Sequence, residues 1–226
     1  MFSKDSVSLT SGRENKAKWF FNRYHRYFAN SSILDVGCDQ GYLRHLIDAD
    51  SRYYGVGNRG AVDQLVDLEV DLLPFQTASF DCVLCLDVLE HVENIHEVFD
   101  QLCRVTRRHV ILSLPNAYCT FWDMLRAGEY APDTPMKYHN LPVAMPEDRH
   151  KWFFCVSEAR RFVEARAAAC GMAIVASDVD QFLSEGRGIK RLIRKLARKI
   201  LVPAPISHED LFGRTLWIVM QKDVGV

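Results

Sequence analysis

The 226-residue sequence predicts an α/β fold, with an open, seven-stranded, mostly parallel sheet and helices on both faces. Short, continuous apolar runs alternate with segments of helical periodicity, which is typical of strands buried between two helical layers. The composition is that of an ordinary globular protein, with 48% hydrophobic and 25% charged residues. A chain of this length forms one core more readily than two, so we expect a single domain over residues 1–226.

The first half of the chain carries five of the expected strands. Aromatic residues at helical spacing from Arg13 to Phe28 predict an amphipathic helix within residues 1–30, covering one side of the core. Helical spacing recurs at 41–47 and 95–105, whereas the helix after the second strand is cut short. The strands are expected at residues 32–37, 53–57, 64–68, 80–86 and 109–114.

The second half is expected to contain two insertions. Residues 115–150 hold five of the eight prolines, which predicts a substrate-capping insertion over 115–156, after the fifth strand. A helix near 157–170 and strands at 172–176 and 215–220 complete the sheet. A basic amphipathic helix is expected within a second insertion, residues 184–206, between strands six and seven.

The net charge of −1 hides a cationic segment. Seven of the 28 basic residues lie within 187–199, which contains no acid, so the remainder has 21 basic and 29 acidic residues. This excludes a broadly basic nucleic-acid binder, and the segment lacks the aromatic residues typical of RNA-binding surfaces. Its apolar stripe and basic faces predict peripheral contact with anionic membrane through residues 187–201. The alternative is a helix that packs its stripe on the acidic body.

Other bulk features favour a cytoplasmic protein, with peripheral contact at the inner face of the membrane. No apolar run approaches the ~18–20 residues that span a bilayer, and the start lacks a signal-peptide pattern. Most of the seven cysteines lie in apolar runs, where buried thiols are the favoured interpretation. Cys82 and Cys85 have CxxC spacing without a second pair, so zinc or redox use is the less favoured alternative.

A strand, a glycine turn and a helix start follow one another in Ile33-Leu-Asp-Val-Gly-Cys-Asp-Gln-Gly41. Gly37 allows the backbone to bend sharply and approach a ligand, although an ordinary βα turn has the same pattern. Asp39 occupies the middle glycine position of the dinucleotide-binding pattern, and Tyr42 follows Gly41. Both departures disfavour a nicotinamide-dependent oxidoreductase.

Three further motifs follow in register with the expected strands. They are Asp67–Phe75 with Ser79-Phe-Asp81, Cys85–His91, and Ser113-Leu-Pro-Asn116. With these motifs, residues 30–120 resemble the class I S-adenosylmethionine-dependent methyltransferases, in particular the methyltransferase type 11 and MetW-like group. The resemblance implies a Rossmann-like fold, S-adenosyl-L-methionine as cofactor, and methyl transfer to oxygen or nitrogen of a small-molecule or lipid- or glycan-linked acceptor.

The resemblance also implies a set of cofactor-binding residues. They are Asp35, Gly37, Cys38, Gly41, Asn58, Asp67, Leu68, Asp87 and Val88. The first four match the motif that holds the methionyl part, Asp67 and Leu68 the adenine contact, and the last two the loop beside the methyl donor. Gly57 stands where the family usually has a ribose-binding acid, and Asn58 is a weaker substitute. The alternative function is therefore a non-catalytic binding or scaffold protein on a degenerate methyltransferase fold.

Polar and aromatic residues gather in the insertion after strand five. Methyl transfer to oxygen or nitrogen needs an in-line nucleophile and often a base, and His150 and His139 are the catalytic candidates. Arg149 or Lys151 is suited to hold an anionic group of the substrate. Alternatively, the segment around Asp148 only orders the loop before the next helix.

The Glu90-His91 pair after strand four is explained more readily by helix capping or packing than by catalysis. A metal site needs further histidine or carboxylate ligands, and His96 alone lies near in the sequence. We therefore expect no metal.

Overall fold

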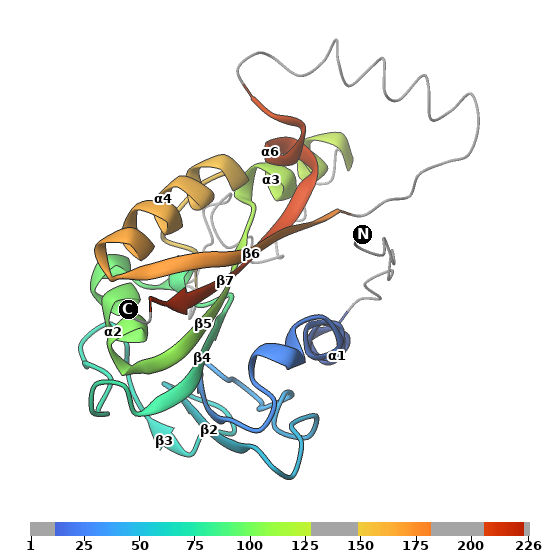
Figure 1. The fold of residues 1–226 in the computed structure, drawn as a ribbon. Helices are drawn as coiled ribbons and strands as arrows, with labels where there is room; N and C mark the ends of the chain where they lie inside the picture. The colour runs from blue at the N-terminus through green and yellow to red at the C-terminus, as the bar shows by residue number, and fades with distance from the viewer. Residues whose placement is uncertain (1–11, 128–148, 182–205, 224–226) are drawn as a thin grey trace.

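The structure, a computed structural model, describes residues 12–127, 149–181 and 206–223. A seven-stranded sheet with strand order β3-β2-β1-β4-β5-β7-β6 forms its centre (Figure 1). Strand β7 runs antiparallel to both of its neighbours and the other pairings are parallel, so the mostly parallel sheet is confirmed. The strands are β1 Ser32–Val36, β2 Arg52–Gly57, β3 Gln64–Leu65, β4 Phe80–Leu86, β5 Thr106–Pro115, β6 Met172–Gln181 and β7 Gly213–Lys222.

Helices cover both faces of this sheet, as the sequence predicts. They are α1 Arg13–Tyr24, α2 Ile95–Val105, α3 Ala117–Ala127, α4 Val156–Ala169 and α6 His208–Phe212, with short 3₁₀ turns η1 His25–Tyr27 and η2 Leu89–His91. Figure 1 shows α1 on one side of the sheet and α2 with α4 on the other. No helix in the described ranges is long and apolar enough to cross a membrane.

The face under α1 is rich in aromatic side chains. Phe20 and Tyr24 from α1 pack against Trp217 of β7, with ring centroids 5.8 and 6.0 Å apart. Ile33 of β1 belongs to the same cluster, and strand alternation directs Asp35 toward this side as well. Helix α1 therefore covers the face of the sheet toward which Asp35 is directed.

Aliphatic residues form the opposite layer. Phe99 and Leu102 of α2 and Val163 of α4 are fully buried against Leu34 and Val83 of the central strands. The apolar spacing over 95–105 predicts α2 with its observed bounds, because one strongly amphipathic stripe faces the sheet.

Several expected elements differ from the structure, and strands five and six are longer than expected, at 106–115 and 172–181. The N-terminal helix stops at Tyr24 and continues as the 3₁₀ turn η1, and the third strand has two residues. Residues 41–47 form successive turns in place of a helix. Asp39 and Gly41 have φ angles of 49° and 65°, so the chain enters this segment in a left-handed conformation. So short a segment cannot stabilise a helix that starts this poorly.

Several predictions lie outside the described residues. His139 and half of the insertion over 115–156 fall at 128–148, although α3 and residues 149–155 of that insertion are described. The basic helix expected within 184–206, including the membrane-contact segment 187–201, falls at 182–205.

Candidate functional site

The carboxyl ends of β1 and β4 meet at the point where the strand order reverses. Val36 pairs with Cys85, so Gly37 and Asp87 follow their strands at the same edge of the sheet. Ligands of open α/β sheets bind at this position because the two crossovers leave in opposite directions. A cavity of about 670 Å³ opens here, within the size range of small-molecule sites.

Asp35 lies at the floor of the cavity and is only 4% exposed. The Tyr53 hydroxyl donates a 2.6 Å hydrogen bond to its Oδ2. Burial raises the pKa of Asp35 to about 6, although the Tyr53 hydrogen bond and the Arg44 guanidinium act in the opposite direction. At neutral pH this carboxylate is ionised in an apolar setting, where it attracts a ligand cation strongly.

Gly37 brings the loop after β1 close to the loop after β4. Its φ is +77°, and a Cβ at this position would lie 2.3 Å from Cγ2 of Val88. Only glycine has both the conformational freedom and the small volume that this turn requires. Gly37 also lines the cavity and is partly exposed, as a cofactor-binding turn requires.

Asp87 closes the cavity from β4. The Ser113 hydroxyl donates to its Oδ1 at 2.6 Å, and Lys16 of α1 forms an ion pair with its Oδ2. Burial acts to raise the pKa of Asp87, but the Lys16 ammonium and the Ser113 hydroxyl hold it below the ordinary value. Its φ of 55° is left-handed for a residue that bears a side chain, and such strain is typical of functional loops.

Two basic residues of α1 reach the cavity, which the sequence pattern did not predict. Arg13 pairs with Asp39, and Lys16 with Asp87. Lys16 also lies over the ring of Trp217, 5.0 Å from its centroid. The recurrence of basic residues between the aromatic positions of the N-terminal segment was the available signal, but it carries no information about the strand ends that α1 crosses.

The loops after β2 and β3 form the far end of the cavity. Asn58 and Arg59 are exposed there, whereas Leu68 is 8% exposed and presents an apolar surface. Asp67 is exposed, and its Oδ1 accepts a hydrogen bond from the backbone N–H of Glu69. A Cβ at Gly57 would meet nothing closer than 3.5 Å, so the site of the missing ribose acid accepts a Cβ without a clash.

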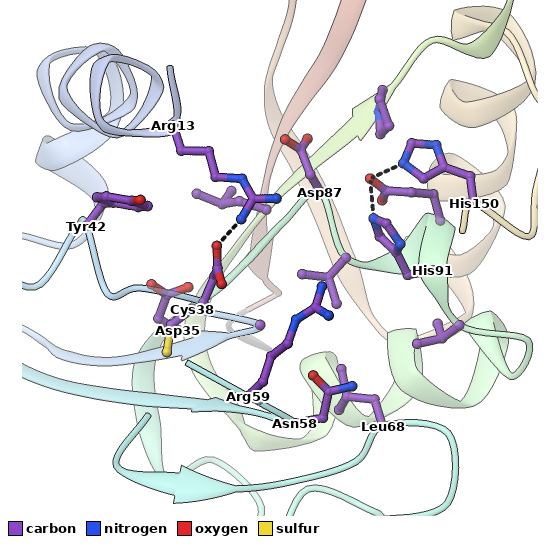
Figure 2. Close-up of a pocket in the computed structure, with 18 of the residues that line it drawn as sticks. Arg13, Asp35, Cys38, Tyr42, Asn58, Arg59, Leu68, Asp87, His91 and His150 are labelled. Atoms are coloured by element: carbon purple, nitrogen blue, oxygen red, sulfur yellow. Dashed lines mark hydrogen bonds and ion pairs between the residues drawn. The ribbon is translucent and has the colours of Figure 1, made fainter. Parts of the chain in front are cut away.

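His150 lies across the cavity from Asp35. Figure 2 shows Arg13, Asp35 and Cys38 on one side, His91 and His150 on the other, and Asp87 between them. Nε2 of His150 is 3.9 Å from Oε1 of Glu90. Because His150 is far from the strand-end motifs in the sequence, its position depends on how the insertion folds back.

The expected cofactor residues gather at this one site. Eight of the nine line the cavity and Gly41, although buried, does not. Cys38 is buried with its Sγ beside Gly55, and burial raises its pKa to about 11, which makes the thiol a poor nucleophile. Arg149 and Lys151 also line the cavity, but Lys151 pairs with Glu69 at 2.6 Å.

A comparison with known protein families shows to which family the chain belongs. A family model described as a methyltransferase domain matches residues 11–166, which is more than half of the chain. The chain belongs to this methyltransferase domain family.

A similar curated protein supports this family membership. A bifunctional methionine biosynthesis protein MetXA/MetW from Rhodopirellula baltica is 31% identical over 139 residues, and the match covers 50% of this chain. It covers 22% of that relative, so the match corresponds to a minor part of the longer protein.

Solved structures share the fold at low sequence identity. A SAM-dependent methyltransferase from Archaeoglobus fulgidus has a TM-score of 0.58 and 17% identity, with 93% of this chain and 95% of that chain covered. Magnesium protoporphyrin IX methyltransferase from Synechocystis, solved with bound SAH, has a TM-score of 0.51 and 14% identity, with 96% and 90% covered. The Rossmann-like methyltransferase fold is therefore confirmed.

The cavity of this methyltransferase domain fits an S-adenosylmethionine cofactor in its chemistry. Gly37 lines the cavity and is partly exposed, so a ligand can approach its backbone. Buried Asp35 suits a cationic group, and the apolar surface of Leu68 suits an aromatic base. Cofactor binding at this cavity is thus consistent with the expectation from sequence.

Proposed function

We propose that the chain is an S-adenosylmethionine-dependent methyltransferase that acts on oxygen or nitrogen of a small-molecule or lipid- or glycan-linked acceptor. The observation that carries the proposal is the cavity where β1 and β4 end, lined by Asp35, Gly37 and Asp87 in a chain of the methyltransferase domain family. Its volume of about 670 Å³ leaves space for a cofactor and part of an acceptor.

In this proposal the cofactor extends along the strand ends. Asp35 and the backbone at Gly37 hold the methionyl part, with Arg13 of α1 supplying positive charge near its carboxylate. Asn58 takes the ribose, and Leu68 contacts the adenine. The arrangement is supported by the strand order β3-β2-β1, because residues that follow each of these strands line the cavity.

The remaining wall is proposed as the acceptor side. S-adenosylmethionine supplies a methyl group on a sulfonium sulfur; a lone pair of the acceptor bonds to that carbon while the carbon–sulfur electrons stay on sulfur. His150 faces this side with Glu90 beside it, which supports a role for its imidazole in receiving the acceptor's proton. His139 stays a second candidate from sequence alone.

Calorimetric titration with S-adenosylmethionine and S-adenosylhomocysteine tests the cofactor assignment. At pH 8 we expect micromolar binding that weakens at least tenfold in Asp35→Asn, because the cationic group loses its buried counter-charge. Asp123→Asn, which changes a partly exposed carboxylate of α3 that pairs with Arg214, is the matched control. NADH is the control ligand.

Absence of binding by either methyl compound at millimolar concentration would overturn the enzyme assignment and favour the non-catalytic scaffold. Equal affinities of the wild type and Asp35→Asn would overturn the role of Asp35 alone. The two outcomes are separable because the first is read from the wild type alone and the second from its comparison with Asp35→Asn.

We further propose that the protein works in the cytoplasm and contacts the inner face of the membrane through residues 187–201. Support comes from the sequence, where seven basic residues and an apolar stripe recur at helical spacing. Flotation with anionic vesicles should recover the protein, and Arg194→Glu with Arg198→Glu should abolish recovery. Equal recovery with neutral vesicles would contradict membrane contact through charge.

A further inference from the structure

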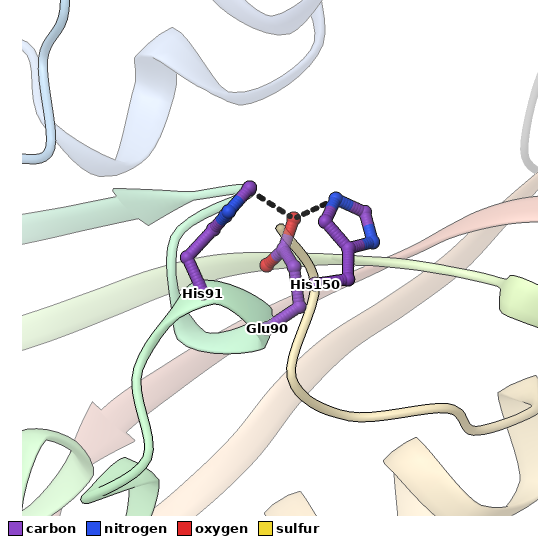
Figure 3. Close-up of side chains that lie close together, drawn as sticks. All are labelled: Glu90, His91 and His150. Atoms are coloured by element: carbon purple, nitrogen blue, oxygen red, sulfur yellow. Dashed lines mark ion pairs between the residues drawn. The ribbon is translucent and has the colours of Figure 1, made fainter. Parts of the chain in front are cut away.

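A glutamate and two histidines converge at the acceptor side of the cavity. Oε1 of Glu90 is 3.6 Å from Nε2 of His91 and 3.9 Å from Nε2 of His150. One ligand-type atom from each of the three lies within 4.8 Å of the others (Figure 3). The imidazole rings of the two histidines meet edge to face, with centroids 4.6 Å apart.

Two separate parts of the chain build this group. Glu90 and His91 are neighbours in the 3₁₀ turn η2, directly after the loop that follows β4. His150 comes from the segment before α4, and its neighbours anchor that segment to the same turn. The backbone N–H of Lys151 donates to the carbonyl of Glu90 at 2.8 Å, and Trp152 Nε1 donates to the carbonyl of Val92 at 2.7 Å.

Because its neighbours are anchored in this way, the fold itself fixes the position of His150. A third contact, the 2.6 Å ion pair between Lys151 and Glu69, ties the segment to the loop after β3. Together these contacts from Lys151 and Trp152 hold the imidazole beside Glu90 before any ligand arrives. Such prior ordering reduces the entropy that binding must overcome.

The distances suit coordination of one ion. An ion about 2.1 Å from each of two ligand atoms requires those atoms to lie no more than about 4.2 Å apart. Both measured separations from the Glu90 oxygen fall under this limit. The ligand atoms of His91 and His150 lie within 4.8 Å of each other, so an ion bound by all three residues would draw the two imidazoles together.

The burial of Glu90 also favours a bound cation at this position. Its side chain is 1% exposed, and a carboxylate buried to this degree is stabilised by a cation held against it, such as a divalent ion.

We propose that Glu90, His91 and His150 bind one divalent first-row transition-metal ion. Two imidazole nitrogens with one carboxylate favour Zn²⁺, Fe²⁺ or Mn²⁺ over Mg²⁺, which prefers oxygen ligands. Three protein ligands leave at least one coordination position, and all three residues line the cavity, so that position is accessible to a ligand within it.

The catalytic role of this ion, unlike its binding, rests on the proposed methyltransferase function. A hydroxyl of the acceptor that binds the ion loses its proton to water more easily, because the ion stabilises the oxyanion. His150 then serves as a metal ligand, and acidification by the ion replaces proton transfer to its imidazole. The metal-binding step itself does not depend on the cofactor.

Metal titration of the full, tag-free chain after chelator treatment tests the site. We expect one Zn²⁺ per chain by calorimetry and mass-spectrometric metal analysis, and a Co²⁺ complex with visible absorption bands. Glu90→Gln and His150→Ala should weaken Zn²⁺ binding at least 100-fold. His96→Ala, which changes an exposed histidine of α2, is the matched control and should bind as the wild type does. Mg²⁺ should bind at least 100-fold more weakly than Zn²⁺.

Each outcome separates the metal site from the methyltransferase assignment. Absent wild-type binding, or affinities equal in Glu90→Gln and wild type, would overturn the metal site. Circular dichroism of Glu90→Gln, which keeps nearly the same shape, verifies that lost binding is not lost folding. Titration of the same metal-free sample with S-adenosylhomocysteine tests the cofactor site independently, so its failure overturns only the proposed function.

Discussion

Replacing Gly37 with alanine should both destabilise the protein and weaken cofactor binding. The φ of +77° costs a side-chain-bearing residue about 1–2 kcal/mol. The new Cβ would also lie 2.3 Å from Cγ2 of Val88, and relieving such overpacking typically costs about 1–3 kcal/mol. We therefore expect a loss of about 2–5 kcal/mol in the free energy of unfolding.

Urea unfolding with two matched variants separates the two costs. Gly171 has a φ of +65°, and no atom lies within 4 Å of the position that an added methyl group would take. Gly171→Ala therefore reports the backbone cost alone, about 1–2 kcal/mol. Val88→Ala removes both Cγ atoms and leaves its Cβ 3.4 Å from the new methyl group, an ordinary contact. The double variant Gly37→Ala/Val88→Ala should recover about 1–3 kcal/mol relative to the sum of the single variants.

Calorimetry with S-adenosylhomocysteine completes this experiment. Gly37→Ala should bind at least tenfold more weakly, because Val88 must shift into the cavity, whereas Gly171→Ala should bind as the wild type does. The reasoning is refuted if Gly37→Ala and Gly171→Ala lose equal stability, or if the double-variant cycle shows no coupling.

Three further changes probe separate parts of the site. Burial raises the folded-state pKa of Asp35 to about 6 from 3.8, so stability should fall as pH rises from about 4 to about 6. Asp35→Asn should remove this decline, of about 3 kcal/mol, in urea unfolding across that range, and equal slopes in both proteins would contradict it. Gly57→Asp should strengthen S-adenosylhomocysteine binding about 3- to 10-fold through the ribose hydroxyls; a gain that persists with an analogue lacking both hydroxyls would refute this. The Asn116 amide donates to the carbonyls of Asp210 and Gly213 at 2.7 and 2.6 Å, so Asn116→Ala should lower stability by about 2–4 kcal/mol, and a loss under about 1 kcal/mol would be inconsistent.

The local sequence pattern was sufficient to predict most strands of the sheet and helix α2. Continuous apolar strands separated by helical segments predict a parallel sheet, and four motifs in register predict which strand ends carry the site. The pattern was insufficient at residues 41–47, where apolar spacing suggests a helix but Asp39 and Gly41 start the segment in left-handed conformations. Periodicity reports which side chains are apolar, not the backbone angles that begin an element.

Contacts between distant segments account for what the sequence pattern missed. Arg13 and Lys16 meet Asp39 and Asp87 only because α1 crosses the ends of β1 and β4. No spacing rule relates these pairs, since their separation in sequence depends on the loops between them.

The fold class, the glycine turn at Gly37 and the strand-end carboxylates Asp35 and Asp87 could all be predicted from the amino-acid sequence. Each depends on local chemistry, namely side-chain period, backbone freedom and residue type. The approach of His150 to Glu90 and His91, which lie far away in the chain, is a property of the folded molecule. Hydrogen bonds and an ion pair to the loops after β3 and β4 make that approach, and such contacts exist only once the sheet has brought those loops together.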